Sequence, residues 1–169
     1  MIVRDASDED ILHICRNLRP EDRLEQFAAR FDDDPDALAA DLIRWRQVKI
    51  AQLALCTDAG EPAILVGAYL ATPTVAKFHM ASTARLAEIG REGHRFGKRR
   101  FIPAVLAPNV AMAEARIMAD HFYARRWVAT CGFVELAGPH PYGKHGEAFV
   151  LVAWLNPGPP FYWTKGRAA

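Results

Sequence analysis

Cysteine, net charge and long apolar runs are all scarce in this 169-residue chain. The cysteines, Cys15, Cys56 and Cys131, are odd in number and widely spaced, so we expect neither a disulfide framework nor a metal site. The 21 basic and 20 acidic residues leave a formal net charge of +1, which makes a nucleic-acid partner unlikely by composition. No apolar run approaches the roughly 18 to 20 residues that span a bilayer, and the acidic start is unlike a signal peptide. These features predict a cytoplasmic protein without membrane contact.

Hydrophobic residues make up 51% of the chain, which is enough to fill the core of one domain. We assign residues 1–156 to this single domain and residues 157–169 to a tail rich in proline, glycine and aromatic residues. The aromatic part of the tail, Phe161, Tyr162 and Trp163, is expected to dock on the same chain or on a neighbour. The oligomeric state stays open.

The spacing of apolar residues switches between strand and helix periods, which predicts a mixed α/β sheet with helices on both faces. Two or three helices are expected between residues 7 and 45, where Ser7 and Asp34 are N-cap candidates. We interpret the acidic run 32–34 as a helix start rather than a cation site. Strands are predicted at 1–4, 50–56, 63–71, 75–81, 112–119, 133–136 and 148–155. Helices are predicted at 84–107, which Pro103 should kink or end, and at 121–131, and a loop is predicted at 138–146.

The segment 112–133 is the most informative part of the chain, because it predicts a strand, a tight turn, a helix and a Gly132-Phe133 step. This order resembles the carboxyl half of the GNAT acyltransferases. The resemblance implies the GNAT fold, with strand 112–119 diverging from its neighbour to admit acetyl-CoA or another acyl-CoA. Ala124 stands at the family's alanine, whereas His121 and Val128 stand where an asparagine and a proton-donating tyrosine are common.

The family's glycine-rich turn, which binds the coenzyme A pyrophosphate through backbone N–H groups, has no match in residues 82–90. Arg85 is a candidate source of positive charge in its place. By the resemblance, the candidates for acetyl-CoA binding are Met80, Ala81, Ser82, Thr83, Arg85, Leu86, Gly90, Arg91, His121 and Ala124.

The segment 141–149, Pro-Tyr-Gly-Lys-His-Gly-Glu-Ala-Phe, gives a narrower resemblance, together with the Arg-Arg-Trp helix at 125–127. Both look like phage-encoded GNAT-like proteins, a group that includes internal virion proteins of T7-like phages. That resemblance implies a phage protein, with phage proteins as partners and the virion as a second location.

Three residues are candidates for the chemistry that such a cleft implies. His79 lies on one expected wall and Glu114 on the other, and either can remove a proton from an attacking amine. Tyr142 lies in a turn at the cleft mouth and is a candidate replacement for the missing acid. Tyr123 is five residues before Val128, about 140° away around the helix, and faces elsewhere. The alternative is that His79 and Glu114 are ordinary strand residues and that Tyr142 pins its loop.

Two features of helix 84–107 have two interpretations each. Gly90, Gly93 and Gly97 share one face, which suits either coenzyme A lying along the helix or close packing on the sheet. Arg91, with Arg95 and Lys98 beside it, suits either a phosphate or plain solvent.

Two functions therefore remain from the sequence. One is an N-acetyltransferase that moves an acetyl group from acetyl-CoA to the amine of a small molecule or peptide by direct attack. The other is a non-catalytic phage structural or accessory protein that retains the fold.

Overall fold

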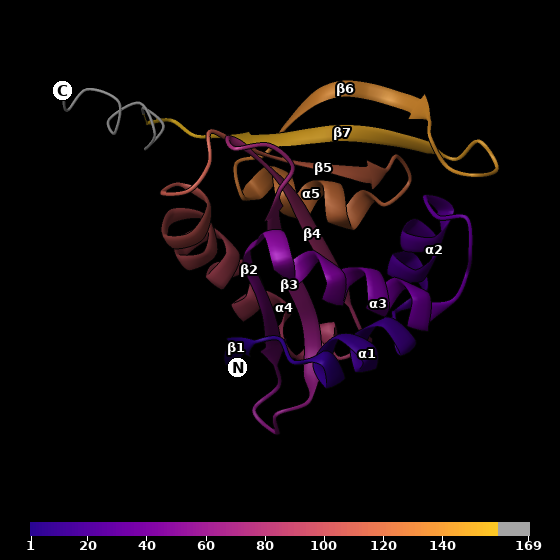
Figure 1. The fold of residues 1–169 in the computed structure, drawn as a ribbon, viewed down its shortest axis with the longest axis vertical. Helices are drawn as coiled ribbons and strands as arrows, with labels where there is room; N and C mark the ends of the chain where they lie inside the picture. The colour runs from indigo at the N-terminus through magenta and orange to yellow at the C-terminus, as the bar shows by residue number, and fades with distance from the viewer. Residues whose placement is uncertain (159–169) are drawn as a thin grey trace.

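The computed structural model describes residues 1–158 and shows one mixed sheet between two layers of helices (Figure 1). The seven strands lie in the order β1-β2-β3-β4-β5-β7-β6. They are β1 (Ile2–Asp5), β2 (Lys49–Cys56), β3 (Pro62–Leu70), β4 (Val75–Ser82), β5 (Met112–Met118), β6 (Val134–Pro141) and β7 (Ala148–Leu155). The helices are α1 (Asp8–Arg16), α2 (Pro20–Ala28), α3 (Pro35–Arg44), α4 (Leu86–Phe96) and α5 (Phe122–Thr130), with a 3-10 turn η1 (Trp45–Val48) and a π-helix η2 (Gly97–Leu106). The predicted mixed α/β fold is confirmed.

The first helices begin where their capping residues predict. Ser7 and Asp10 form a reciprocal capping box at α1, in which each side chain accepts a hydrogen bond from the other residue's backbone N–H. Asp34 accepts from the N–H of Asp36 at 2.8 Å, and Pro35 opens α3. The acidic run 32–34 therefore serves a helix start, as predicted.

The sheet separates two apolar cores. Helices α1 and α3 cover one face, where Ile14 and Leu42 pack on Leu65 and Ala81 of the sheet. The segments α4, η2 and α5 cover the other face, in a larger core that includes Phe101 and Val128. Burial of these faces supplies the main stabilisation of the fold. No helix in residues 1–158 is long and apolar enough to cross a membrane.

Strands β4 and β5 pair in parallel for three residues and then separate. The paired positions are Val75 with Met112, Ala76 with Ala113, and Lys77 with Glu114. Beyond Lys77, β4 keeps its antiparallel pairing with β3 up to Ser82, and β5 keeps its pairing with β7 up to Met118. The sheet thus opens between two well-supported strands, and this opening positions the candidate site.

The predicted helix 84–107 does not end at Pro103. It changes at Gly97 from α-helix to a ten-residue π-helix, and the N–H of Ala107 donates to the carbonyl of Ile102 at 2.9 Å. The wider π turn tolerates the missing N–H of Pro103, while full burial of Phe101 and Leu106 holds the segment on the sheet.

The predicted end of the strand at residue 136 and the predicted loop at 138–146 were wrong in part. Strand β6 continues to Pro141, pairing with β7 through register shifts between Glu135 and Ala137 and again between Ala137 and His140. An edge strand tolerates Gly138 and proline because one side of its backbone needs no partner. The expected docking of the aromatic tail lies outside the described residues.

Candidate functional site

The gap between β4 and β5 is a cleft with three connected parts. Its centre, the β4–β5 gap, is a cavity of about 60 Å³ that His79 and Met80 line from β4 and Arg116 and Ile117 line from β5. Helix α2 closes it on one side, and Ala124 of α5 lines it on the other. The gap therefore joins the two faces of the sheet.

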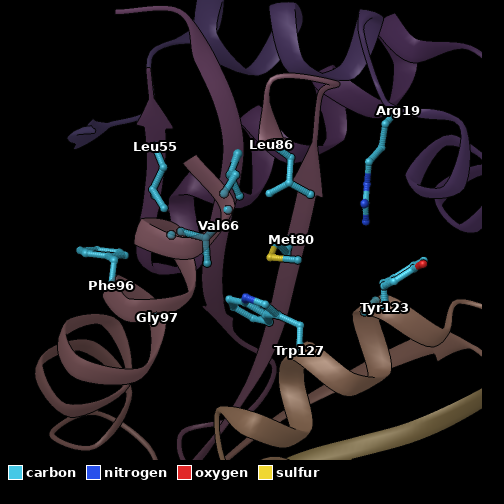
Figure 2. Close-up of a pocket in the computed structure, with 13 residues that line it drawn as sticks. Arg19, Leu55, Val66, Met80, Leu86, Phe96, Gly97, Tyr123 and Trp127 are labelled. Atoms are coloured by element: carbon cyan, nitrogen blue, oxygen red, sulfur yellow. The ribbon is translucent and has the colours of Figure 1, made fainter. Parts of the chain in front are cut away.

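The second part, the α4–α5 cavity, has a volume of about 270 Å³ and is mostly apolar (Figure 2). It shares Met80 and Ala124 with the gap. Four of the residues predicted to bind acetyl-CoA line it, namely Met80, Leu86, Gly90 and Ala124. Arg19, Tyr123 and Trp127 extend into it from the loop before α2 and from α5 (Figure 2).

The third part, the Trp45 cavity, lies on the opposite face of the sheet and has a volume of about 390 Å³. It contains all three predicted catalytic residues, His79, Glu114 and Tyr142. Trp45 and Tyr69 form an aromatic wall there, with ring centroids 4.5 Å apart. Because His79 lines this cavity and the gap, it stands where the two meet.

His79 is half-buried, and its Nε2 atom is buried without a hydrogen-bond partner in residues 1–158. Its ring meets Trp45 edge-on, with centroids 6.5 Å apart. Burial lowers the pKa of His79 to about 4, which outweighs the opposing charge of Asp22. The imidazole is therefore neutral at neutral pH, and one ring nitrogen is available to accept a proton.

Glu114 and Tyr142 each have a partner already. Glu114 forms an ion pair with Lys77, directly across the last paired position of β4 and β5. Tyr142 stacks edge-on against Phe149 at 5.5 Å, and the guanidinium of Arg116 lies 4.4 Å above its ring. Both side chains are thus positioned on the wall of the Trp45 cavity rather than free in it.

Helix α2 satisfies the backbone of both diverging strands with carboxylates. Asp22 accepts from the Ser82 N–H at 2.7 Å and from the Ser82 hydroxyl, and Glu25 accepts from the Met118 N–H at 2.9 Å. These amides have lost strand partners because β4 and β5 have separated. A buried N–H needs an acceptor, so the two carboxylates stabilise the open sheet.

His121 links the two carboxylates to Arg19. Its Nδ1 is 2.9 Å from Glu25, and its Nε2 is 3.1 Å from Nη2 of Arg19, which also bonds Asp22 at 2.8 Å. In the neutral ring with its proton on Nδ1, Nε2 accepts from Arg19 and Nδ1 donates to Glu25. Burial lowers the pKa of His121, but the hydrogen bond and charge of Glu25 outweigh it, so the net shift is upward.

The remaining predicted acetyl-CoA residues do not line the α4–α5 cavity. Ala81 points to the α1–α3 face, and Thr83 is buried beside the start of α4, where its hydroxyl accepts from the Arg85 N–H at 3.2 Å. Arg85 is exposed and pairs with Glu61 and Glu88. Arg91 is exposed on α4.

The three glycines of the α4 face behave differently. A Cβ on Gly93 would meet Cδ1 of Ile64 at 2.9 Å, and a Cβ on Gly97 would meet the Trp127 ring at 3.2 Å. A Cβ on Gly90 would meet Leu86 at 3.7 Å, an ordinary contact. Gly93 and Gly97 therefore serve close packing, while Gly90 borders open space in the cavity.

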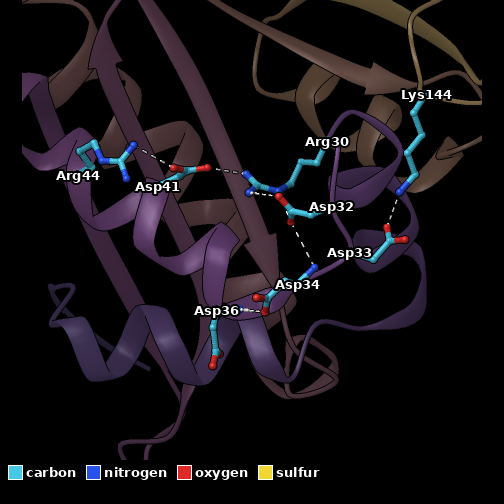
Figure 3. A network of polar contacts seen from close by, with 8 residues as sticks. All are labelled: Arg30, Asp32, Asp33, Asp34, Asp36, Asp41, Arg44 and Lys144. Carbon is cyan, nitrogen blue, oxygen red and sulfur yellow. Dashed lines mark hydrogen bonds and ion pairs between the residues drawn. The ribbon is translucent and has the colours of Figure 1, made fainter.

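The loop between β6 and β7 docks on the segment between α2 and α3, beside the Trp45 cavity. Lys144 donates its backbone N–H to the carbonyl of Ala28 at 2.8 Å and pairs with Asp33 at 2.6 Å (Figure 3). Arg30 joins Asp32 and Asp41 in the same region at 3.2 and 2.9 Å (Figure 3). The acidic segment is thus neutralised by basic side chains and holds the loop that carries Tyr142.

Sequence reasoning missed Arg19 and Trp127 as cleft residues. The available signal for Trp127 was its spacing: it lies three residues after Ala124 and therefore on the same face of α5. Arg19 had no local signal, because its partner His121 is 102 residues away.

No family model matches this sequence, and no curated protein matches it significantly. Solved structures do match. The fold is similar to that of the phosphinothricin acetyltransferase Pat from Sinorhizobium meliloti in complex with AcCoA, with a TM-score of 0.68 and 15% identity over 92% of this chain and 88% of that one. Ard1 from Thermoplasma volcanium gives a TM-score of 0.66 and 18% identity over 91% and 96% of the two chains.

The spermidine N-acetyltransferase SpeG from Vibrio cholerae, as a mutant, gives a TM-score of 0.67 and 12% identity over 92% of this chain and 93% of that one. The chain has the GNAT fold. Val128, which the sequence resemblance aligns with the usual GNAT tyrosine, is buried and lines the β4–β5 gap. An aliphatic side chain there donates no proton.

Proposed function

We propose that this protein is an N-acetyltransferase that uses acetyl-CoA and a primary amine. The observation that carries the proposal is the separation of β4 and β5 after three paired residues, with a cavity on each face of the sheet and His79 and Met80 at the junction. Two substrates that bind from opposite faces would meet there, and such positioning supplies a large part of the rate in a direct transfer.

The α4–α5 cavity suits the pantetheine arm of acetyl-CoA, because it is apolar and Gly90 leaves room along α4. The fit is less good at the pyrophosphate, since Asp22 already occupies the Ser82 amide. We assign the phosphate contacts to side chains instead. Arg19 has a buried Nε without a partner in the described chain, and the exposed Arg85 and Arg91 flank the start of α4.

Acetyl-CoA would supply the acetyl group as a thioester, and the chain would position and activate the amine. The Met80 carbonyl accepts from Gln26 at 3.4 Å across the gap, and the Met80 N–H lies on the same edge of β4. That N–H is our candidate for stabilising the developing oxyanion. His79 would accept the amine proton at Nε2, Glu114 would hold Lys77, and Tyr142 would shape the acceptor side.

The acceptor is a small-molecule or peptide amine. The similar structures include phosphinothricin, spermidine and ribosomal-protein-alanine acetyltransferases, so the shared feature of their acceptors is an amine. A cavity of about 390 Å³ accommodates a compact acceptor or the end of a peptide.

A non-catalytic role is the second candidate, and the occupied Ser82 amide favours it together with Val128. On this view the fold is a scaffold, as in the phage-encoded GNAT-like proteins that segment 141–149 resembles, and its partners are other phage proteins. The two candidates differ in one property: the scaffold has no need of acetyl-CoA.

The test is thiol release from acetyl-CoA in the presence of a panel of small amines and amino-terminal peptides. Ala124→Phe places a ring at the junction of the α4–α5 cavity and the gap, and we expect it to abolish turnover. Ala129→Phe adds the same ring at an exposed position of α5 and should leave turnover unchanged. Equal activity of the two variants, or no thiol release from any amine, would contradict the proposal.

A further inference from the structure

The charged side chains that line the Trp45 cavity are two acids, Glu25 and Glu114, and two bases, Lys77 and Arg116. Glu114 is paired with Lys77, and Glu25 is engaged by the Met118 N–H and by His121. The remaining charged side chain is Arg116, which has no ion-pair partner within residues 1–158. An arginine without an ion-pair partner on the wall of a cavity is able to bind an anion there.

Arg116 is exposed, and its guanidinium stacks on an aromatic ring without using its hydrogen-bond donors. It projects from β5 on the same face as Glu114, two residues earlier, and its guanidinium lies 4.4 Å above the Tyr142 ring. Stacking on a ring occupies the flat face of a guanidinium and leaves the N–H groups at its edge. Those N–H groups suit a carboxylate, which two parallel hydrogen bonds can hold.

The Trp45 cavity also has an aromatic wall and a neutral histidine. Trp45 and Tyr69 form the aromatic wall, and burial raises the pKa of the Tyr69 hydroxyl to about 12, so it stays neutral. His79 is neutral as well, with its free Nε2 where the cavity joins the gap. The cavity thus offers one site for an anion and one site that can accept a proton from an amine.

We propose that the acceptor is an amine that also carries a carboxylate, with the amino group at His79 and the carboxylate on Arg116. This inference rests on the proposed acetyl transfer for its reaction, although the carboxylate site is a binding property that exists without it. Arg116 is accordingly a specificity-determining residue. Polyamines, which carry several positive charges and no carboxylate, are poor ligands of this cavity.

The probes are matched pairs: α- and ω-amino acids of increasing length, each with its carboxamide, and spermidine as the polycation. Binding is measured by calorimetry in the absence of acetyl-CoA, and thiol release is measured separately with it. We expect the best amino acid to bind about ten to a hundred times more tightly than its amide, which is the usual contribution of charge-assisted hydrogen bonds.

Arg116→Gln should reduce this preference to about threefold or less, chiefly by weakening the acid rather than the amide. Arg116→Lys keeps the positive charge but loses the paired N–H donors of the guanidinium, so it should give an intermediate preference for the acid over the amide. The matched control is Arg23→Gln, since exposed Arg23 also lies over an aromatic ring, that of Phe27 at 5.0 Å, but outside this cavity. The thermal unfolding midpoint of each variant identifies any loss through misfolding.

Equal binding of acid and amide, tighter binding of spermidine, equal effects of Arg116→Gln on both members of a pair, or no binding by any probe would overturn the carboxylate site. One further result would distinguish failure of the proposed function from failure of the carboxylate site. If amino acids bind through Arg116 and no amine releases thiol from acetyl-CoA, the carboxylate site stands and acetyl transfer fails.

Discussion

Replacing His79 with glutamine should change how the stability of the protein depends on pH. The unfolded histidine has a pKa near 6.5, and burial lowers the pKa of folded His79 to about 4. The unfolded state therefore binds a proton first as the pH falls. The stabilisation is complete above pH 6.5, decreases between pH 6.5 and pH 4, and changes no further below that.

The free-energy difference over this interval is roughly 3 kcal/mol, because each unit of pKa difference is worth about 1.4 kcal/mol. His79→Gln removes the titrating group and with it this part of the pH dependence. Urea unfolding at intervals from pH 4 to pH 8 measures the effect, provided that the m-value stays constant. His13→Gln, at an exposed position of α1, is the matched control.

Wild type should lose about 2 to 3 kcal/mol more stability than His79→Gln between pH 7.5 and pH 4.5. Parallel curves for wild type and variant would refute this expectation, because they would mean that folded His79 takes up its proton as readily as the unfolded chain. The imidazole resonances of His79, followed by NMR over the same interval, report its protonation directly.

Three further predictions concern packing and charge. Gly90→Ala should raise the free energy of unfolding by about 0.5–1 kcal/mol, because alanine has the higher helix propensity. Gly93→Ala should be less stable than Gly90→Ala, because its Cβ would meet Ile64 of the sheet. Thermal unfolding of the two variants checks both predictions. Asp22→Ala should cost about 3–5 kcal/mol, since it leaves half-buried Arg19 without its carboxylate and the buried Ser82 N–H without an acceptor; urea unfolding measures it, and a cost below 1 kcal/mol would contradict the network. Lys144→Ala removes an ion pair with an exposed partner and should cost at most about 1 kcal/mol in the same assay, with a larger loss meaning that the loop depends on it.

Local signals in the sequence were sufficient for most of the fold. The N-caps at Ser7 and Asp34 defined two helix starts, and the change of apolar period defined the three-stranded meander. The divergence of the strand at 112–119 was predicted by resemblance to GNAT proteins, and the three-residue pairing of β4 with β5 agrees with it. These features depend on neighbours in the chain or on a recurring order of elements.

The features that the sequence did not predict depend on contacts between distant residues. The helix was predicted to extend across Pro103, but its change to a π-helix at Gly97 was not, and burial of Phe101 and Leu106 holds that segment on the sheet. The clustering of Asp22, Glu25 and His121 requires α2 to lie over the open edge of β4 and β5, and no local spacing indicates that. Arg116 was passed over for the same reason, since its value depends on which other charges are already paired.

Titration of acetyl-CoA into the wild-type protein by calorimetry tests the central claim most directly. The account predicts saturable binding of one molecule per chain, loss of that binding in Ala124→Phe but not in Ala129→Phe, and thermal stabilisation that grows with ligand concentration. At a hundred times the dissociation constant the added stability is about 2.7 kcal/mol. Absence of both heat and stabilisation at millimolar acetyl-CoA would contradict the account and leave the scaffold as the function that the fold serves.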